Sequence, residues 1–214
     1  MKGVIAMNQR INQILFALLR SAVYGGQLKD TEKAVFSEEM LPQLLAISRK
    51  HDVAHLLAVG IDQNGLISEQ LKKESKIEYE ILKAVYRYER LNAEYKRICN
   101  ALEKAEISFL PLKGSVIRKD YPEAWMRTSC DIDILVRKSD VDKAISYLVE
   151  NHQYVFDWKG PKDVSLFSPS KQHIELHYSL MEDDVANSAS EILQSVWDTA
   201  THKDGYNYWY EMPD

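Results

Sequence analysis

Residues 129–136 read Ser-Cys-Asp-Ile-Asp-Ile-Leu-Val, and this stretch decides the fold that the sequence predicts. Successive side chains of a strand point to opposite faces, so Asp131 and Asp133 are expected on one face and Ile132 and Ile134 on the other. Aspartate is disfavoured in strands, so a pair of them indicates a purpose other than strand formation. The pattern predicts a strand that anchors the core with one face and presents two converging carboxylates on the other.

The two carboxylates can serve as metal ligands. Alternate residues of an extended strand are about 6.6 Å apart. Both side chains can therefore reach a pair of divalent ions ~3.5 to 4 Å apart, an arrangement that activates an attacking oxygen and neutralises a leaving one. An exposed edge strand with solvated carboxylates would give the same pattern, so Asp-x-Asp alone leaves both interpretations open.

A second polar feature precedes this strand. Residues 110–118 read Leu-Pro-Leu-Lys-Gly-Ser-Val-Ile-Arg, which predicts a strand, a tight turn at Gly114 and Ser115, and the start of a helix. The glycine permits close backbone approach, and helix N-terminal N–H groups beside a serine hydroxyl suit a phosphate. Such a turn is also common without a ligand, so it carries weight only together with the aspartates.

The spacing of apolar residues changes near residue 105. In residues 1–105 nearly every apolar side chain recurs at helical spacing, which predicts a helical region. A helix predicted over residues 68–106 would be about 60 Å long if straight, so a break or bend is expected. Residues 106–214 combine short β-branched and aromatic runs with two helical segments, which predicts an α+β unit with a mixed or antiparallel sheet. The strands are predicted at 107–111, 131–136, 153–158, 164–168 and 173–178, and the helices at 139–151 and 187–200.

Taken together, these residues resemble the nucleotidyltransferase superfamily that includes DNA polymerase beta, in which a Gly-Ser turn is followed by an Asp-hydrophobic-Asp strand. They are most similar to a family of uncharacterised nucleotidyltransferases with the run LKG…YP…R…DIDLLV. The matching residues are Leu112 to Ser115, Tyr121-Pro122, Arg127 and Asp131 to Val136, and the helical stretch Ser48 to Leu57 is similar as well. The resemblance implies a helical region followed by a nucleotidyltransferase-fold mixed sheet flanked by helices.

The superfamily has a third carboxylate on a later strand, and Glu175 is the candidate. Alternation places His173, Glu175 and His177 on one strand face. A separate metal site of these three residues is disfavoured, because the two histidines are about 13 Å apart along an extended strand. The resemblance therefore implies Asp131, Asp133 and Glu175 as ligands of Mg²⁺ or Mn²⁺, with Glu175 alternatively a general base and His177 lining the pocket.

Basic residues near these motifs are expected to balance a triphosphate. Lys113 lies beside the Gly114-Ser115 turn, Arg118 follows one helical turn later, and Arg127 precedes the aspartates. Arginine contacts phosphate in a bidentate manner. For Arg118 and Arg127 the alternative is a salt bridge that orients the aspartates.

The resemblance implies transfer of a nucleoside monophosphate from a nucleoside triphosphate to a hydroxyl group, with release of pyrophosphate. The acceptor stays open among a small molecule, a peptide or protein, and an RNA end. The net charge of -5 and the lack of a long Lys or Arg run argue against a nucleic-acid partner. Two alternatives remain: a non-catalytic binding module of the same fold, and an Asp-x-Asp glycosyltransferase, which would be expected to carry an α/β nucleotide-binding region before its aspartates.

Further expectations concern location and completeness. Cys99 and Cys130 show no CxxC spacing, which suits the cytoplasm, and the apolar stretch 14–19 is too short to span a membrane. His51 and His55 have the i, i+4 spacing of a zinc protease, but Asp52 stands at the glutamate position, so packing or pocket lining is expected. The resemblance implies further helices beyond residue 214. The aromatic-rich end at Tyr208-Trp209-Tyr210 therefore predicts either a truncated chain, with part of the acceptor pocket missing, or a patch that a partner buries.

Overall fold

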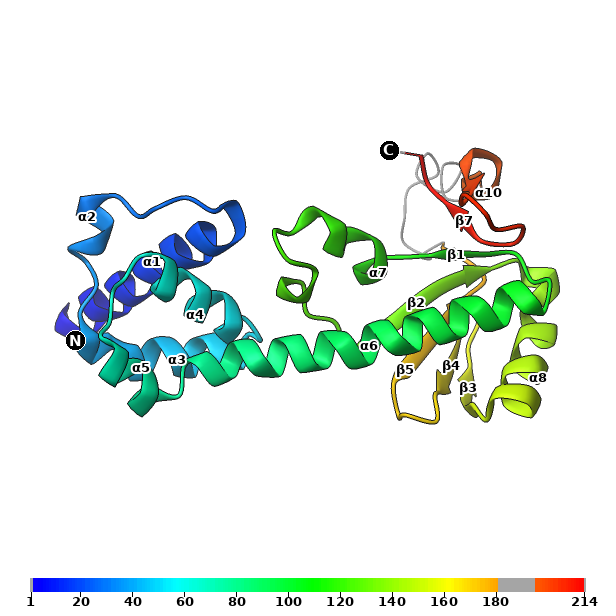
Figure 1. The fold of residues 1–214 in the computed structure, drawn as a ribbon, viewed down its shortest axis with the longest axis horizontal. Helices are drawn as coiled ribbons and strands as arrows, with labels where there is room; N and C mark the ends of the chain where they lie inside the picture. The colour runs from blue at the N-terminus through cyan, green and yellow to red at the C-terminus, as the bar shows by residue number, and fades with distance from the viewer. Residues whose placement is uncertain (1, 181–194, 214) are drawn as a thin grey trace. The chain divides into compact units, whose positions relative to one another are not determined.

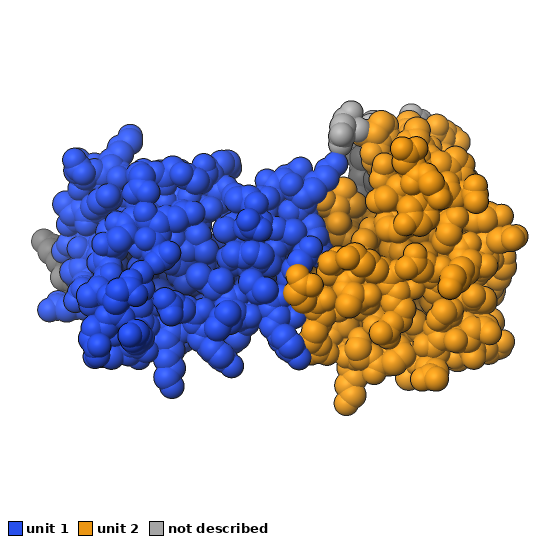
Figure 2. Space-filling view, viewed as in Figure 1, with its two compact units in different colours: residues 1–88, 118–128 blue, residues 89–117, 129–214 orange. Residues whose placement is uncertain are grey.

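The computed structural model describes residues 2–180 and 195–213. Helices dominate the first half of the chain and a five-stranded mixed sheet the second (Figure 1), which confirms the predicted α+β class. Residue contacts divide the chain into two compact units, 1–88 with 118–128 and 89–117 with 129–214 (Figure 2). The predicted division at residue 105 stays a prediction. Within the described residues, no helix is both long and apolar enough to cross a membrane.

The first unit is helical. Its core is a cluster of aliphatic side chains from α1, α3 and α4 that includes Leu18, Leu44, Leu57 and Ile61. The segment 118–128 belongs to this unit although it lies between the two motifs of the second half. The elements are α1 (Lys2–Tyr24), α2 (Asp30–Lys33), η1 (Glu38–Met40), α3 (Leu41–Lys50), α4 (Ala54–Gln63), α5 (Glu69–Ser75), the first part of α6 (Glu78–Lys104), η2 (Arg118–Asp120) and η3 (Ala124–Met126).

The predicted break in the long helix is confirmed. Helix α5 ends at Ser75, Lys76 adopts a left-handed conformation with φ of 55°, and α6 begins at Glu78. A lysine in this conformation is strained, because its Cβ crowds the following carbonyl oxygen. The chain therefore changes direction at one residue rather than bending over several turns.

The second unit contains the sheet, in the order β1-β2-β5-β4-β3. Strands β2 and β5 are parallel, whereas the other neighbours are antiparallel. All five predicted strands are found, with ends that differ by at most two residues. The elements after α6 are β1 (Phe109–Pro111), α7 (Gly114–Ile117), β2 (Asp131–Val136), η4 (Lys138–Asp140), α8 (Val141–His152), β3 (Val155–Lys159), β4 (Asp163–Phe167), β5 (His173–His177), α10 (Val196–Thr199), β6 (Thr201–His202) and β7 (Tyr210–Glu211).

The predicted helices of this half are found in part. Helix α8 matches the prediction over 139–151 to within two residues. Of the helix predicted over 187–200, residues 187–194 lie outside the described part of the chain, and α10 covers four of the remainder.

One face of the sheet is apolar. Ile132 and Ile134 of β2 and Ile174 and Leu176 of β5 are fully buried in a cluster that also contains side chains of α6 and α8. Alternation along each strand then directs the intervening polar residues to the opposite face. Burial of the isoleucines thus orients Asp131 and Asp133, as the sequence predicted.

Lys76→Gly is expected to stabilise the protein by about 1 kcal/mol, because glycine adopts the left-handed conformation without steric cost. Lys73→Gly, at an exposed position inside α5, is the matched control and is expected to destabilise by about 1 kcal/mol. Urea denaturation monitored by circular dichroism measures both changes. Equal destabilisation by the two glycines would contradict a helix break at Lys76.

Candidate active site

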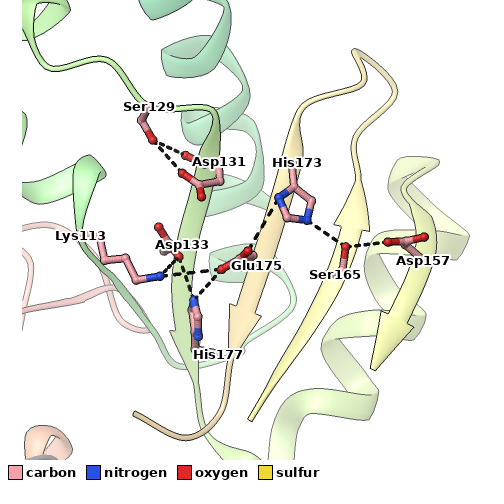
Figure 3. Close-up of polar contacts among 9 residues, drawn as sticks. All are labelled: Lys113, Ser129, Asp131, Asp133, Asp157, Ser165, His173, Glu175 and His177. Carbon is pink, nitrogen blue, oxygen red and sulfur yellow. Dashed lines mark hydrogen bonds and ion pairs between the residues drawn. The ribbon is translucent and has the colours of Figure 1, made fainter. Parts of the chain in front are cut away.

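The carboxylates lie on two neighbouring parallel strands, β2 and β5. In this pairing Asp131 stands opposite His173, and Asp133 stands opposite Glu175. Figure 3 shows these side chains on the same side of the sheet. Asp133 is nearly buried, with 3% of its surface exposed, whereas Asp131 and Glu175 are partly exposed. The register therefore brings together the three carboxylates that the sequence selected.

Asp133 is the centre of a hydrogen-bond network. Its Oδ1 accepts hydrogen bonds from His177 Nε2 at 2.8 Å and from Lys113 Nζ at 2.6 Å. The same two donors lie near Glu175 Oε2, at 3.3 Å for His177 and 3.8 Å for Lys113 (Figure 3). Two carboxylates thus share two basic side chains at the end of the sheet nearest β1.

This network moves the two carboxyl pKa values in opposite directions. Burial acts to raise the pKa of Asp133, but hydrogen bonds from His177 and Lys113 hold it below its ordinary value. Burial and the neighbouring Asp133 raise the pKa of Glu175 above its ordinary value, although Lys113 and His177 oppose the change. Asp133 is therefore the more strongly ionised member of the pair, and a cation between the two would relieve their repulsion.

Asp131 is oriented by Ser129. The Ser129 hydroxyl lies 2.9 Å from both the Asp131 backbone oxygen and its Oδ1. Gly114 packs against this serine, since a Cβ added at Gly114 would lie 3.2 Å from Ser129 Oγ. The glycine thus makes room for the residue that orients Asp131. Sequence reasoning assigned no role to Ser129.

The predicted strand, turn and helix at residues 110–118 are present, with β1 leading into α7. Lys113 adopts a left-handed conformation with φ of 45°, and strain of this kind is common at functional sites. The amides of Ser115, Val116 and Ile117 donate to the carbonyls of Leu112 and Lys113. These three amides therefore have little remaining capacity for a phosphate, and the nucleotide-binding role of Lys113 stays a prediction.

Ser115, Arg118 and Arg127 keep their nucleotide-binding roles as predictions. The Ser115 hydroxyl is buried without a hydrogen-bond partner in the part of the chain that the structure describes. Arg118 and Arg127 belong to the first unit, whereas the carboxylates belong to the second. The Arg118 guanidinium lies 5.5 Å from the centre of the Tyr88 ring, and Arg127 donates to the Thr128 carbonyl.

His55 is buried, and its Nε2 lies 2.8 Å from the Met126 carbonyl oxygen. It packs near Trp125 with ring centroids 6.2 Å apart, which agrees with the predicted packing role. Burial lowers the pKa of His55, so its ring is neutral near pH 7. Neither His51 nor His55 belongs to a potential metal-binding group among the described residues.

Two groups of side chains can hold a divalent cation. One consists of Asp131, His173 and Glu175, the other of Asp133, Glu175 and His177, and the ligand atoms within each lie within 4.8 Å of one another. Glu175 belongs to both groups, and neither contains both histidines. The carboxylate and imidazole donors suit divalent metal ions. Sequence reasoning placed His173 on this face by alternation but did not select it as a ligand.

Because the pKa of Glu175 is raised in the folded state, its ionisation destabilises the fold at neutral pH. In buffer with a metal chelator, Glu175→Gln is therefore expected to raise the melting temperature at pH 7 by roughly 1 to 3 °C. The gain should vanish near pH 4, below the pKa of the unfolded carboxyl, about 4.3. Differential scanning calorimetry at both pH values measures the effect.

Asp133→Asn is the counterpart. The lowered pKa of Asp133 contributes stability above its unfolded pKa that is lost as the pH falls through its folded pKa, so this substitution should lower the melting temperature at pH 7. A shift of the same sign for both variants at pH 7 would contradict the opposite pKa changes.

Comparison with known proteins identifies a family that matches this chain. A family model described as uncharacterised nucleotidyltransferase matches residues 37–212, which include every residue of the carboxylate network. No match was found among curated proteins or among solved structures. Since the model covers well over half of the 214 residues, the chain belongs to this family of uncharacterised nucleotidyltransferases.

Proposed function

We propose that the protein is a metal-dependent enzyme that transfers a nucleoside monophosphate from a nucleoside triphosphate to a hydroxyl acceptor and releases pyrophosphate. The observation that carries the proposal is the pair of three-ligand groups that share Glu175 on one face of the sheet. Members of a nucleotidyltransferase family need such a face for the metal ions that accompany a triphosphate.

Asp131, Asp133 and Glu175 are the proposed ligands of Mg²⁺ or Mn²⁺. Their oxygens are the donors that these ions prefer. When bound, the ions supply charge neutralisation at the attacking and leaving oxygens. Glu175 belongs to both ligand groups, which favours its role as a shared ligand over the alternative role of general base.

Lys113 is the proposed partner of the triphosphate. Burial acts to lower the pKa of its ammonium, but the hydrogen bond to Asp133 raises it above its ordinary value, so the group is charged at neutral pH. More than half of the side-chain surface is exposed, at 58%, so the ammonium can also reach a bound ligand. Gly114, Ser115, Arg118, Arg127 and His177 complete the proposed nucleotide-binding residues.

In the proposed reaction the acceptor oxygen forms a bond to the α-phosphorus, the bond from that phosphorus to the bridging oxygen of pyrophosphate breaks, and the hydroxyl proton passes to water. The protein contributes position and charge neutralisation rather than a covalent step. Ser129 keeps Asp131 in place, and His177 keeps Asp133 in place, so the ligands are ordered before substrate binds.

The glycosyltransferase alternative receives no support, because β1, Phe109–Pro111, is the only strand among the described residues before Asp131, and the other elements there are helices. An experiment distinguishes the non-catalytic binding module from the enzyme. Thermal shift with ATP, GTP, CTP or UTP is expected to show stabilisation that requires Mg²⁺. At a ligand concentration of 100 Kd the gain is about 2.7 kcal/mol, or roughly 5 to 10 °C. Stabilisation without transfer activity would favour the binding module.

Asp131→Asn is expected to reduce transfer by about 10³-fold or more while the fold persists, because a neutral amide cannot replace an ionic metal ligand. The assay incubates protein with each α-³²P-labelled triphosphate and cell extract, then identifies the labelled product. Asp142→Asn, at an exposed position in α8, is the control and should keep full activity. Wild-type rates in a well-folded Asp131→Asn preparation would rule out the assignment.

A further inference from the structure

A row of polar side chains continues from the carboxylates across β5, β4 and β3. His173 Nε2 lies 2.9 Å from the Ser165 hydroxyl oxygen, and this hydroxyl lies 3.0 Å from Asp157 Oδ2 (Figure 3). Asp157 is the extra residue of a β-bulge, since Phe156 pairs with Leu166 and Trp158 pairs with Ser165. Bulges of this kind often lie next to active sites, where they direct a side chain.

The row fixes the position of the proton on His173. The Ser165 hydroxyl donates its hydrogen to Asp157 Oδ2. Its oxygen then accepts from His173 Nε2, which must carry the hydrogen. A neutral imidazole has one N–H group, so the neutral form that donates through Nε2 has its lone pair on Nδ1.

Nδ1 faces the carboxylates. It lies 3.9 Å from Glu175 Oε1, which is too long for a hydrogen bond. Ligand atoms bound about 2.1 Å from one ion lie roughly 3 to 4 Å from each other, so this spacing suits two ligands of the same ion. Asp131 supplies the third donor of this group. A nitrogen lone pair directed toward a carboxylate is repelled by it. A cation bound between the two groups attracts both and makes the arrangement favourable.

His177 differs in this respect. Its Nε2 is the nitrogen nearest the carboxylates, and it donates to Asp133 at 2.8 Å. That nitrogen carries the hydrogen of this bond, so His177 could bind a metal ion through it only by giving up the hydrogen bond to Asp133. Of the two histidines on β5, His173 is therefore the better ligand, and His177 is better suited to orient Asp133.

We propose that His173 coordinates, through Nδ1, the metal ion held by Asp131 and Glu175, and that Ser165 and Asp157 are positioning residues for its ring. Imidazole nitrogen favours first-row transition metals over Mg²⁺. This position therefore prefers Mn²⁺ to Mg²⁺. The inference rests on the metal site of the proposed function and adds the identity of a nitrogen ligand and of the ion.

The test measures metal binding to the full chain, with Mn²⁺ and Mg²⁺ alone as probes. Pulsed EPR of bound Mn²⁺ is expected to show coupling to an imidazole ¹⁴N, and His173→Gln should abolish it. Calorimetry should show Mn²⁺ affinity reduced by about 10-fold or more in this variant, with Mg²⁺ affinity changed less than about threefold. His152→Gln, in α8, is the control and should keep the wild-type spectrum.

Ser165→Ala and Asp157→Ala test the positioning role. Both leave every proposed ligand in place, so each should still bind Mn²⁺. The ¹⁴N coupling should change in magnitude and the Mn²⁺ affinity should fall by about 10-fold, as for other residues that orient a ligating histidine. A loss of stability alone, with the wild-type ¹⁴N coupling and affinity, would show that the row has only a structural role.

The remaining outcomes separate this inference from the proposed function. In one outcome, Mn²⁺ binding depends on Asp131, but the ¹⁴N coupling survives in His173→Gln or disappears in His177→Gln instead. This outcome overturns the assignment of His173 as a ligand and keeps the proposed metal site. Equal affinity for Mn²⁺ and Mg²⁺ overturns the preference for the ion. Failure of the wild-type protein to bind either ion, with or without a nucleoside triphosphate, overturns both proposals.

Discussion

The parallel pairing of β2 with β5 is the constraint on which the site depends. This register places Asp131 beside His173 and Asp133 beside Glu175. The register in turn depends on burial, because Ile132, Ile134, Ile174 and Leu176 must all face the apolar cluster. A slip of one residue in either strand would turn its carboxylates into that cluster. Core packing and the geometry of the site are therefore set by the same alternation.

The same pairing brings the carboxylates of Asp133 and Glu175 together, and hydrogen-bond donors from other residues compensate for their repulsion. Lys113 reaches Asp133 from a strained turn, and His177 reaches it from the end of β5. These contacts keep Asp133 ionised, while Glu175 experiences the remaining repulsion and has a raised pKa. A site organised in this way suits a cationic ligand, since a cation would interact with both carboxylates at once.

Much of the fold was predictable because the relevant signals are local. Alternation in residues 131–136 gave the strand and its two faces, and the same rule placed Glu175 with His173 and His177. A break or bend within residues 68–106 was expected from length alone, although its position at Lys76 was not. The division of the chain at residue 105 stays a prediction, and so do the phosphate roles of Arg118 and Arg127.

What the sequence could not supply is the identity of the side-chain contacts that orient the ligands. Ser129 was visible beside Asp131, but nothing in its spacing indicated that it would orient that carboxylate. Asp157 and Ser165 are eight residues apart, and their contact depends on a bulge that shifts the pairing of β3 with β4. Since a bulge cannot be located from alternation, the row that orients His173 is visible only in the structure.

The polar face of the sheet has two ends that differ in their hydrogen-bond donors and lone pairs. Toward β1, Lys113 and His177 present N–H groups to Asp133, and this end suits a negatively charged group. Toward β3, the row from Asp157 through Ser165 turns a lone pair of His173 to the carboxylates. Glu175 lies between the ends and belongs to both ligand groups. Two cations on this face would therefore have different surroundings, one with N–H donors nearby and one with a nitrogen ligand, although the three carboxylates are common to the whole face.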